Sequence, residues 1–324
     1  MLHVLTVTFP FFALVLAGYL AARRKMLPLE AIPGMNTFVL FFALPCMLFR
    51  FGASTPVAQL LDGALFFTYL FCALVMVGFV VAVSMNRRIR WNDAAFGALV
   101  AAFPNTGFMG VPLLVALLGT AAAGPAIVTI VVDMVITTSL CVALSRLDGA
   151  DKHGFSHAAG NALRGMVSNP MPWSILLGAL ASAVQLELPK PVGQTVNLLA
   201  DAASPVALFT IGAVLARSQM LVISAGTRPI PLRDYVPVAV IKLLVHPLLV
   251  LLVGTAAIQA GVPLDRFALT VVVLVAALPS ASNVSMLAEK FGADNGRIAR
   301  IILVSTAAAF LTFSAAVSLL VARG

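Results

Sequence analysis

The sequence alternates between long apolar runs and short polar connections. Ten runs have about the 20 residues that an α-helix needs to cross the hydrocarbon core of a bilayer. They cover residues 4–22, 31–52, 60–85, 93–118, 125–145, 170–185, 192–216, 235–261, 266–290 and 296–321. This pattern predicts an all-α integral membrane protein with ten transmembrane helices.

The fourth and ninth runs are interrupted near their middle by helix-breaking and polar residues. Residues 101–114 read AAFPNTGFMGVPLL, and residues 276–287 read AALPSASNVSML. Pro104, Pro112 and Pro279 each lack a backbone N–H and are the predicted helix-break residues. In hydrocarbon, a broken helix is tolerated only where it is enclosed by protein or lines a watered cavity. The two breaks are therefore expected to cross near the middle of the membrane.

Paired interruptions in the two halves of a chain are typical of a transporter's binding site. The second part of each broken helix would begin at the crossing with free N–H groups, which favour an anion. This predicts a carboxylate held at the crossing by Asn105, Thr106, Gly107, Gly110, Ser280, Ser282 and Asn283. The alternative is that the polar side chains only cap the broken helices.

Composition independently supports the membrane class. Of the 324 residues, 61% are hydrophobic and 10% are charged, and the mean hydropathy is +1.06. Ordinary soluble domains carry about 25% charged residues. A soluble core could not bury this much apolar surface, whereas a lipid bilayer can.

The net charge of +8 comes mainly from alternate connections. The connections after the first, third, fifth, seventh and ninth runs carry or border most of the Lys and Arg residues, namely Arg23, Arg24, Lys25, Arg87, Arg88, Arg90, Arg146, Lys152, Arg164, Arg217, Arg228, Arg233, Lys290, Arg297 and Arg300. The positive-inside rule makes this side cytoplasmic, so both termini are expected to be extracytoplasmic. The arrangement fits a cell membrane (plasma or inner) protein and leaves no case for nucleic-acid binding.

The two halves of the chain repeat each other. Pro10 and Pro170, Gly18 and Gly178, Pro45 and Pro205, and Gly52 and Gly212 are each 160 residues apart. Five runs are an odd number, so the second half must be inverted relative to the first. The predicted domains are a first five-helix repeat (1–146), a cytoplasmic connector (147–167) and a second, inverted repeat (168–324).

Asp133, Lys242 and His246 lie well inside predicted spans, where burial of charge is costly and a functional role is the default hypothesis. Asp133 and His246 are candidates for coupling to a proton or cation, although Asp133 could equally be a buried structural partner. Lys242 lies four residues before His246, on the same helix face, and could bind a second substrate carboxylate. Snorkelling of Lys242 to the basic side is the alternative.

Other classes of protein find little support. The four histidines have no zinc-like spacing, and the sequence has no phosphate-binding GxxxxGK[ST] loop, so neither an enzyme nor an ATP-driven pump is expected. A membrane receptor or sensor for an organic acid stays an alternative from another class. No cofactor is expected, and a coupling ion, H⁺ or Na⁺, is left open.

Three segments resemble the auxin efflux carrier family, whose prokaryotic members include proteins named malonate and malate permeases. They are NTFVLFFALP at 36–45, PNTGFMGVPLL at 104–114 and ALPSASNVSMLAEKFG at 277–292. The resemblance implies a scaffold of helices 1, 2, 6 and 7 that often forms homodimers. It also implies a transport domain of helices 3–5 and 8–10 that moves in an elevator-like, alternating-access cycle.

The long hydrophilic central loop of many plant carriers is absent, so the short prokaryotic type is the nearer one. We therefore expect a secondary transporter of small organic anions, with malonate or a related dicarboxylate as the first choice. A carrier of monocarboxylates or auxin-like amphipathic acids is the alternative. The expected partners are a small carboxylate, the lipid bilayer and a second copy of the chain.

Overall fold

The computed structural model describes residues 2–54, 62–146, 170–224 and 230–321. Within these ranges the chain is helical and has no strand. Seven helices are long and apolar enough to cross a membrane, and shorter apolar helices occupy 106–118, 173–183 and 266–277. The predicted connector at 147–167 lies outside the described residues. The all-helical membrane class is thus confirmed.

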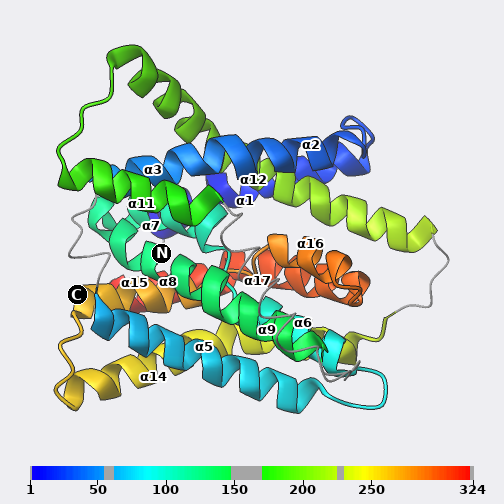
Figure 1. Ribbon diagram of the computed structural model, residues 1–324. Coiled ribbons are helices and arrows are strands. Elements are labelled where there is room, and N and C mark those ends of the chain that lie inside the picture. Colours follow the sequence, from blue (N-terminus) through cyan, green and yellow to red (C-terminus); the bar gives the residue numbers. More distant parts are fainter. Residues whose placement is uncertain (1, 55–61, 147–169, 225–229, 322–324) are drawn as a thin grey trace.

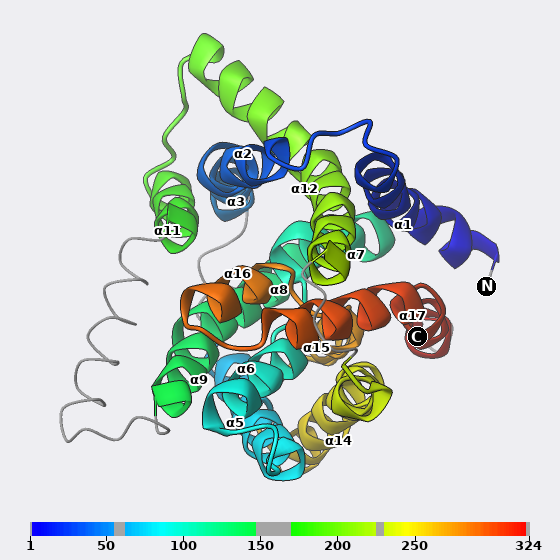
Figure 2. The same cartoon turned by 90° about the vertical axis from the view of Figure 1, so that its right-hand side faces the viewer.

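The helices form two groups, which lie on opposite sides of the molecule in both views (Figures 1 and 2). The first group comprises α1 (Leu2–Arg23), α2 (Ala31–Phe38), η1 (Val39–Ala43), α3 (Leu44–Ser54), α11 (Pro170–Ala183) and α12 (Lys190–Ser224). Within it, α1 packs along α12, and α3 packs along α11. Both ends of the chain lie at the same end of the helices in Figure 1.

The second group is larger and contains both broken helices. From the first half of the chain come α5 (Gly63–Ser84), α6 (Trp91–Ala102), η2 (Thr106–Gly110), α7 (Val111–Leu118), η3 (Thr120–Ala122), α8 (Ala123–Val131), η4 (Val132–Thr137) and α9 (Thr138–Ser145). From the second half come η6 (Leu232–Asp234), α13 (Val236–Val240), η7 (Ile241–Val245), α14 (His246–Gln259), α15 (Arg266–Ala277), α16 (Asn283–Lys290) and α17 (Asn295–Val321). Of these, α7 also contacts α1.

Four glycines allow close helix contacts in the first group. A Cβ atom at Gly18 would overlap the backbone oxygen of Phe209, and one at Gly212 would overlap that of Val15. In the same way, Gly52 lies against α11 and Gly178 lies against α3. The 160-residue offset that relates Gly18 to Gly178 and Gly52 to Gly212 therefore also relates one helix contact to the other.

Two features of the helices differ from the sequence-based expectation. The helix α12 continues to Ser224, beyond the predicted end at residue 216, and so includes Arg217. The helices predicted at 31–52, 125–145 and 235–261 each contain a π-helical turn, η1, η4 and η7 respectively. Such turns are frequent at functional sites, and periodicity alone does not reveal them.

Arg297 borders the basic connection after the ninth predicted run, and the structure buries it. The side chain is only 2% exposed. Its Nε donates to the carbonyl oxygen of Asp234 at 2.7 Å and its Nη1 to that of Asp93 at 2.8 Å. Arg297 therefore joins α17 to the start of α6 and to η6, because burial of a guanidinium requires acceptors.

Candidate functional site

The two helix breaks lie side by side and bond to each other. The first lies between α6 and η2 and the second between α15 and α16. The N–H of Asn105 donates to the carbonyl of Pro279 at 2.8 Å, and the N–H of Ala281 donates to the carbonyl of Phe103 at 2.9 Å. Pro104 and Ser280 thus form an isolated antiparallel bridge. This pairing satisfies backbone groups that the breaks would otherwise leave exposed to lipid.

One polar side chain from each break lines a small cavity at this junction. Asn105 and Asn283 both border it, together with Pro104, Gly107 and residues of α3, α8 and η4. Its volume is about 20 Å³, enough for roughly one water molecule. The described conformation is therefore closed around the junction.

Three buried oxygens at the junction have no hydrogen-bond partner within the described part of the chain. They are Asn105 Oδ1, Thr106 Oγ1 and Asn283 Oδ1. Leaving a buried polar atom unpaired costs about 1–3 kcal/mol, so such atoms call for an explanation. An amide carries both an acceptor and donors, so the two asparagines can also offer N–H groups to an anion.

The remaining predicted residues of the second break have different surroundings. Ser280 is buried and lies beside Ser305 of α17, whose Oγ is 3.2 Å from Ser280 Oγ. Ser285 donates to Asn295 Oδ1 at 2.8 Å, which leaves it occupied within the fold. Ser282 is partly exposed at the start of α16.

Gly107 and Gly110 serve different purposes at the first break. Gly107 borders the cavity, and a Cβ there would meet only Leu44 at 4.0 Å. A Cβ at Gly110 would meet Leu278 Cδ1 at 2.5 Å. Gly110 thus lets the Leu278 side chain of the second break pack directly on the first break, and a Cβ there would require that side chain to shift.

The expectation that Pro112 breaks the helix is wrong. The chain stays helical from Thr106 to Leu118, because η2 passes directly into α7 at Val111. Pro112 comes directly after the π-helical turn, where the regular i to i−4 hydrogen bonds are already interrupted. The lack of an N–H at Pro112 therefore does not break the helix. The true breaks contain Pro104 and Pro279.

Both breaks are followed by a helix that begins at the junction. Asn105 is the N-terminal flanking residue of η2, and α16 begins at Asn283. The N–H of Thr106 already donates to the Pro104 carbonyl, and those of Val284 and Ser285 donate to the carbonyls of Ala281 and Ser282. Each terminus therefore acts on a ligand mainly through its partial positive charge, about half an elementary charge. Two such termini beside one cavity favour a carboxylate over a cation.

The ionisable residues predicted as coupling candidates lie in a separate buried cluster of the second group. Tyr69 Oη of α5 donates to Asp133 Oδ2 at 2.9 Å, and Thr137 Oγ1 lies 3.3 Å from Asp133 Oδ1. Lys242 Nζ lies 3.0 Å from His246 Nδ1 and donates to the carbonyl of Ala276 at 2.8 Å. We call Tyr69, Asp133, Lys242 and His246 the buried polar cluster.

The snorkelling alternative for Lys242 is therefore wrong. Its side chain is fully buried and its ammonium points to α15, because the carbonyl of Ala276 and the His246 ring supply acceptors inside the protein. Lys242 does not border the cavity at the junction, and the described residues that line this cavity include no basic side chain. Ala276 lies in the last turn of α15, so the cluster contacts the helix that leads into the second break.

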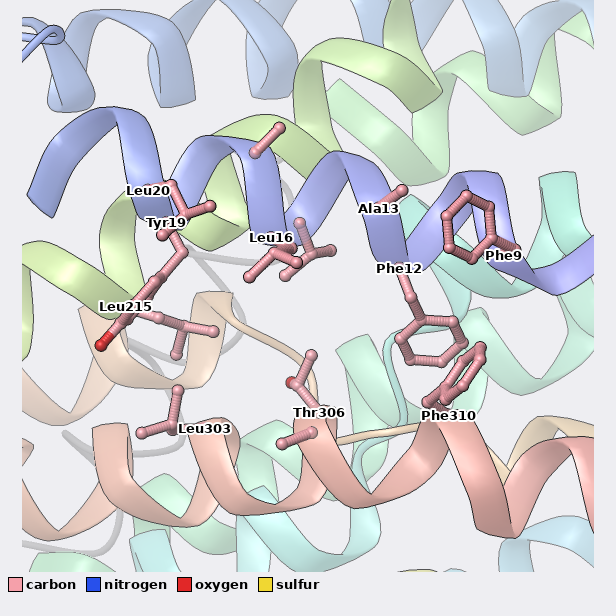
Figure 3. Close-up of a pocket in the computed structure, with 13 residues that line it drawn as sticks. Phe9, Phe12, Ala13, Leu16, Tyr19, Leu20, Leu215, Leu303, Thr306 and Phe310 are labelled. Carbon is pink, nitrogen blue, oxygen red and sulfur yellow. The ribbon is translucent and has the colours of Figure 1, made fainter. Parts of the chain in front are cut away.

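A much larger groove, about 570 Å³, lies between α1 and α17. Figure 3 shows Phe12 of α1 facing Phe310 of α17. The same groove is lined by Phe9, Leu16 and Leu20 of α1 and by Leu303 and Thr306 of α17. The lining is almost wholly apolar, so the groove offers few of the donors that a carboxylate requires. It lies between the two groups of helices.

Sequence reasoning did not find two residues of these sites. Tyr69 lies in an uninterrupted apolar run, and Ser305 lies in the middle of a predicted span. Ser305 reaches the second break only because α17 crosses it. The polarity of Tyr69 and Ser305 within apolar runs is the signal that could have suggested a role.

Comparison with known proteins places the chain among transporters. The model of a family described as "Membrane transport protein" matches residues 3–317. A Rhizobium meliloti (strain 1021) protein named "Putative malonate transporter" is 30% identical over 298 residues, which cover 92% of this chain and 89% of the relative.

Two further relatives broaden the comparison. "Uncharacterized transporter YfdV" of Escherichia coli (strain K12) is 27% identical and covers 87% of this chain and 86% of its own length. "Auxin efflux carrier component 8" of Arabidopsis thaliana is 22% identical and covers 70% of this chain and 75% of its own length. The named relatives are transporters, and none of their names describes an enzyme.

Proposed function

The chain belongs to the membrane transport protein family that includes the auxin efflux carriers, and from this premise we propose that it carries small organic anions across the cell membrane. The observation that carries the proposal is the pair of asparagines at the helix breaks. Asn105 and Asn283 come from different halves of the chain, border one cavity and keep buried oxygens without partners. Two helix N-termini beside them add positive potential.

Malonate or a related dicarboxylate is the proposed substrate. The name of the Rhizobium meliloti relative supports this choice. A monocarboxylate or amphipathic acid is the second candidate, because no basic side chain borders the cavity to hold a second carboxylate. In the described, closed conformation Lys242 donates to the Ala276 carbonyl of α15. A dicarboxylate is favoured if Lys242 reaches the site in an open conformation, and a monocarboxylate is favoured if it does not.

The proposed mechanism is an elevator-like exchange of access to a site that moves with the second group of helices. The first group would be the scaffold, and its paired glycine contacts support an inverted repeat of five plus five helices. The closed junction requires some movement before a substrate can enter. The apolar groove between α1 and α17 supplies a boundary without strong polar bonds across which such movement can occur. We include a homodimer through the scaffold in this proposal.

The proposal is tested by uptake of labelled malonate into proteoliposomes, with succinate, acetate and an indole acid as competitors. Saturable uptake blocked by succinate is expected for a dicarboxylate carrier. Block by acetate or the indole acid, without malonate uptake, would support the second candidate. If the reconstituted protein moves none of these acids, organic-anion transport is wrong.

Asn105→Ala tests the site itself. This change removes an amide that borders the cavity, so we expect at least about a tenfold loss of uptake, as for removal of a buried hydrogen bond to a charged group. Ser318→Ala is the matched control, because Ser318 Oγ donates to the Ser314 carbonyl within α17, away from the junction. Normal uptake by Asn105→Ala would contradict the site assignment.

A further inference from the structure

The buried polar cluster is unusual in holding an acid and a base without a direct ion pair between them. Asp133, Lys242 and His246 are all fully buried. Among the described residues, no ion pair joins Asp133 to Lys242, although the ammonium acts electrostatically on the carboxylate. Lys242 is instead held by His246 and the carbonyl of Ala276.

The surroundings of the Asp133 carboxylate come from five helical segments. Tyr69 of α5 and Thr137 of η4 are its hydrogen-bond partners. Asp133 interacts electrostatically with Cys141 of α9, and Cys72 of α5 lies near Tyr69. Lys242 of η7 is the base that acts electrostatically on the carboxylate, and His246 of α14 bonds to Lys242. A buried carboxylate with so few partners can be stable either ionised or protonated.

The location of the cluster links it to the substrate site. Tyr69, Asp133, Lys242 and His246 all belong to the second group of helices, and Lys242 bonds to the last turn of α15 just before the second break. With Asp133 ionised and Lys242 charged, the two charges cancel. One added proton leaves a net positive charge that offsets one negative charge of a bound anion.

This compensation matters because moving charge across a membrane is costly. The free energy of moving one elementary charge across the membrane rises in proportion to the membrane potential. A cytoplasm-negative potential therefore opposes entry of an anion, and a proton carried on the same moving unit reduces the opposition.

We infer that the Asp133 carboxylate binds and releases a proton in each transport cycle, and that Tyr69, Lys242 and His246 position it. The step is simple protonation: the carboxylate takes a proton from the side to which the site is open and releases it on the other side. The inference rests on the proposed function, because the proton accompanies the anion bound at the junction. It assigns Lys242 to the cluster instead of to a second substrate carboxylate.

The test compares two assays in proteoliposomes with the membrane potential held at zero. The first assay is malonate exchange at equal pH on both sides, and the second is net accumulation with acid outside. One proton per substrate allows at most about tenfold accumulation for each pH unit. We expect Asp133→Asn to keep exchange and to lose accumulation, because its amide retains the shape but binds no proton.

Asp201→Asn is the matched control. Asp201 lies in α12, is exposed and pairs with Arg50 Nη1 at 2.6 Å, so the same chemical change there should leave both assays intact. Accumulation by Asp133→Asn equal to that of the wild type would overturn the inference. Wild-type exchange without any response to the pH gradient would also overturn it, while leaving the proposed function standing. Absence of exchange in the wild type would instead contradict the proposed function.

Tyr69→Phe decides the matter if Asp133→Asn is inactive in both assays. Loss of the Tyr69 hydroxyl removes a donor that stabilises the ionised carboxylate. Protonation then persists to higher pH, and the pH of half-maximal uptake should rise by about one unit. A purely structural role of Tyr69 would lower the rate without moving this pH, and that result would contradict the inference.

Discussion

At the scale of single residues, the protein keeps several polar groups in its interior and gives each a different setting. Asn105 and Asn283 keep unpaired oxygens at a cavity, whereas Ser280 and Ser285 are occupied by Ser305 and Asn295. Unpaired groups are the ones available to a ligand. The hydrogen-bonded serines instead stabilise the break itself. The sequence alone could not distinguish these serines from the asparagines with unpaired oxygens.

Arg297 provides a prediction at this scale. Arg297→Lys keeps the charge but loses the planar fork that reaches the carbonyls of Asp234 and Asp93. We expect a loss of about 2 kcal/mol in stability, the value of two buried hydrogen bonds. The loss of stability is measured by heating the detergent-solubilised protein and then quantifying the protein that stays folded by size-exclusion chromatography.

Arg300→Lys is the matched control for that measurement. Arg300 is partly exposed, and its Nη1 donates to a single carbonyl, that of Ile230, at 3.1 Å. Its replacement should lower the unfolding temperature less than Arg297→Lys does. Equal effects of the two changes would show that burial of Arg297 contributes nothing specific.

At the scale of helices, close packing depends on small residues at the crossing points. In lipid, helices associate through van der Waals contact and not through the hydrophobic effect, so small residues that allow close approach are favoured. Gly18 with Gly212, and Gly52 with Gly178, play this part in the first group. Gly110 plays it where the first break meets Leu278.

Gly212→Ala tests the packing of α1 against α12. The added Cβ would overlap the carbonyl oxygen of Val15, so the helices must separate. Overpacking of this kind costs about 1–3 kcal/mol, and we expect a lower unfolding temperature. Gly34→Ala in α2 meets nothing within 4 Å and should leave that temperature unchanged or slightly raised. The reverse order of the two variants would refute this account of the contact.

At the scale of the whole molecule, the two groups of helices meet across a boundary that combines a wide apolar groove with a few polar contacts. One of these contacts joins Thr8 Oγ1 of α1 to Ser314 Oγ of α17, 3.4 Å apart. Both side chains are buried. If the second group moves against the first, this contact must break in every cycle.

A disulfide between Thr8→Cys and Ser314→Cys tests that movement. The two oxygens are 3.4 Å apart, so the replacement thiols are neighbours, and loss of both free thiols on oxidation verifies the disulfide. The native Cys46, Cys72 and Cys141 are first replaced by Ala, because all three are free thiols. We expect oxidation to abolish uptake and reduction to restore it. The two single-cysteine variants should not respond to oxidation, and undiminished uptake by the cross-linked protein would contradict relative movement of α1 and α17.

The sequence by itself determined the membrane class and the two breaks. Apolar runs of fixed length can only be long helices in lipid, and Pro104 and Pro279 remove donors that a continuous helix needs. These signals are local, so they survive without knowledge of the fold. The same local reasoning misplaced Pro112, because it could not foresee a π-helical turn.

Only the tertiary structure decided which residues meet. The bond from Asn105 to Pro279, the approach of Ser305 to Ser280 and the contact of Lys242 with Ala276 each join helices that are distant along the chain. Buried polar groups take partners wherever packing brings an acceptor or donor within reach, and that depends on all the helices together. For this reason Lys242 points inward to α15 and Arg297 is buried, although the sequence around each of them equally allowed an exposed position.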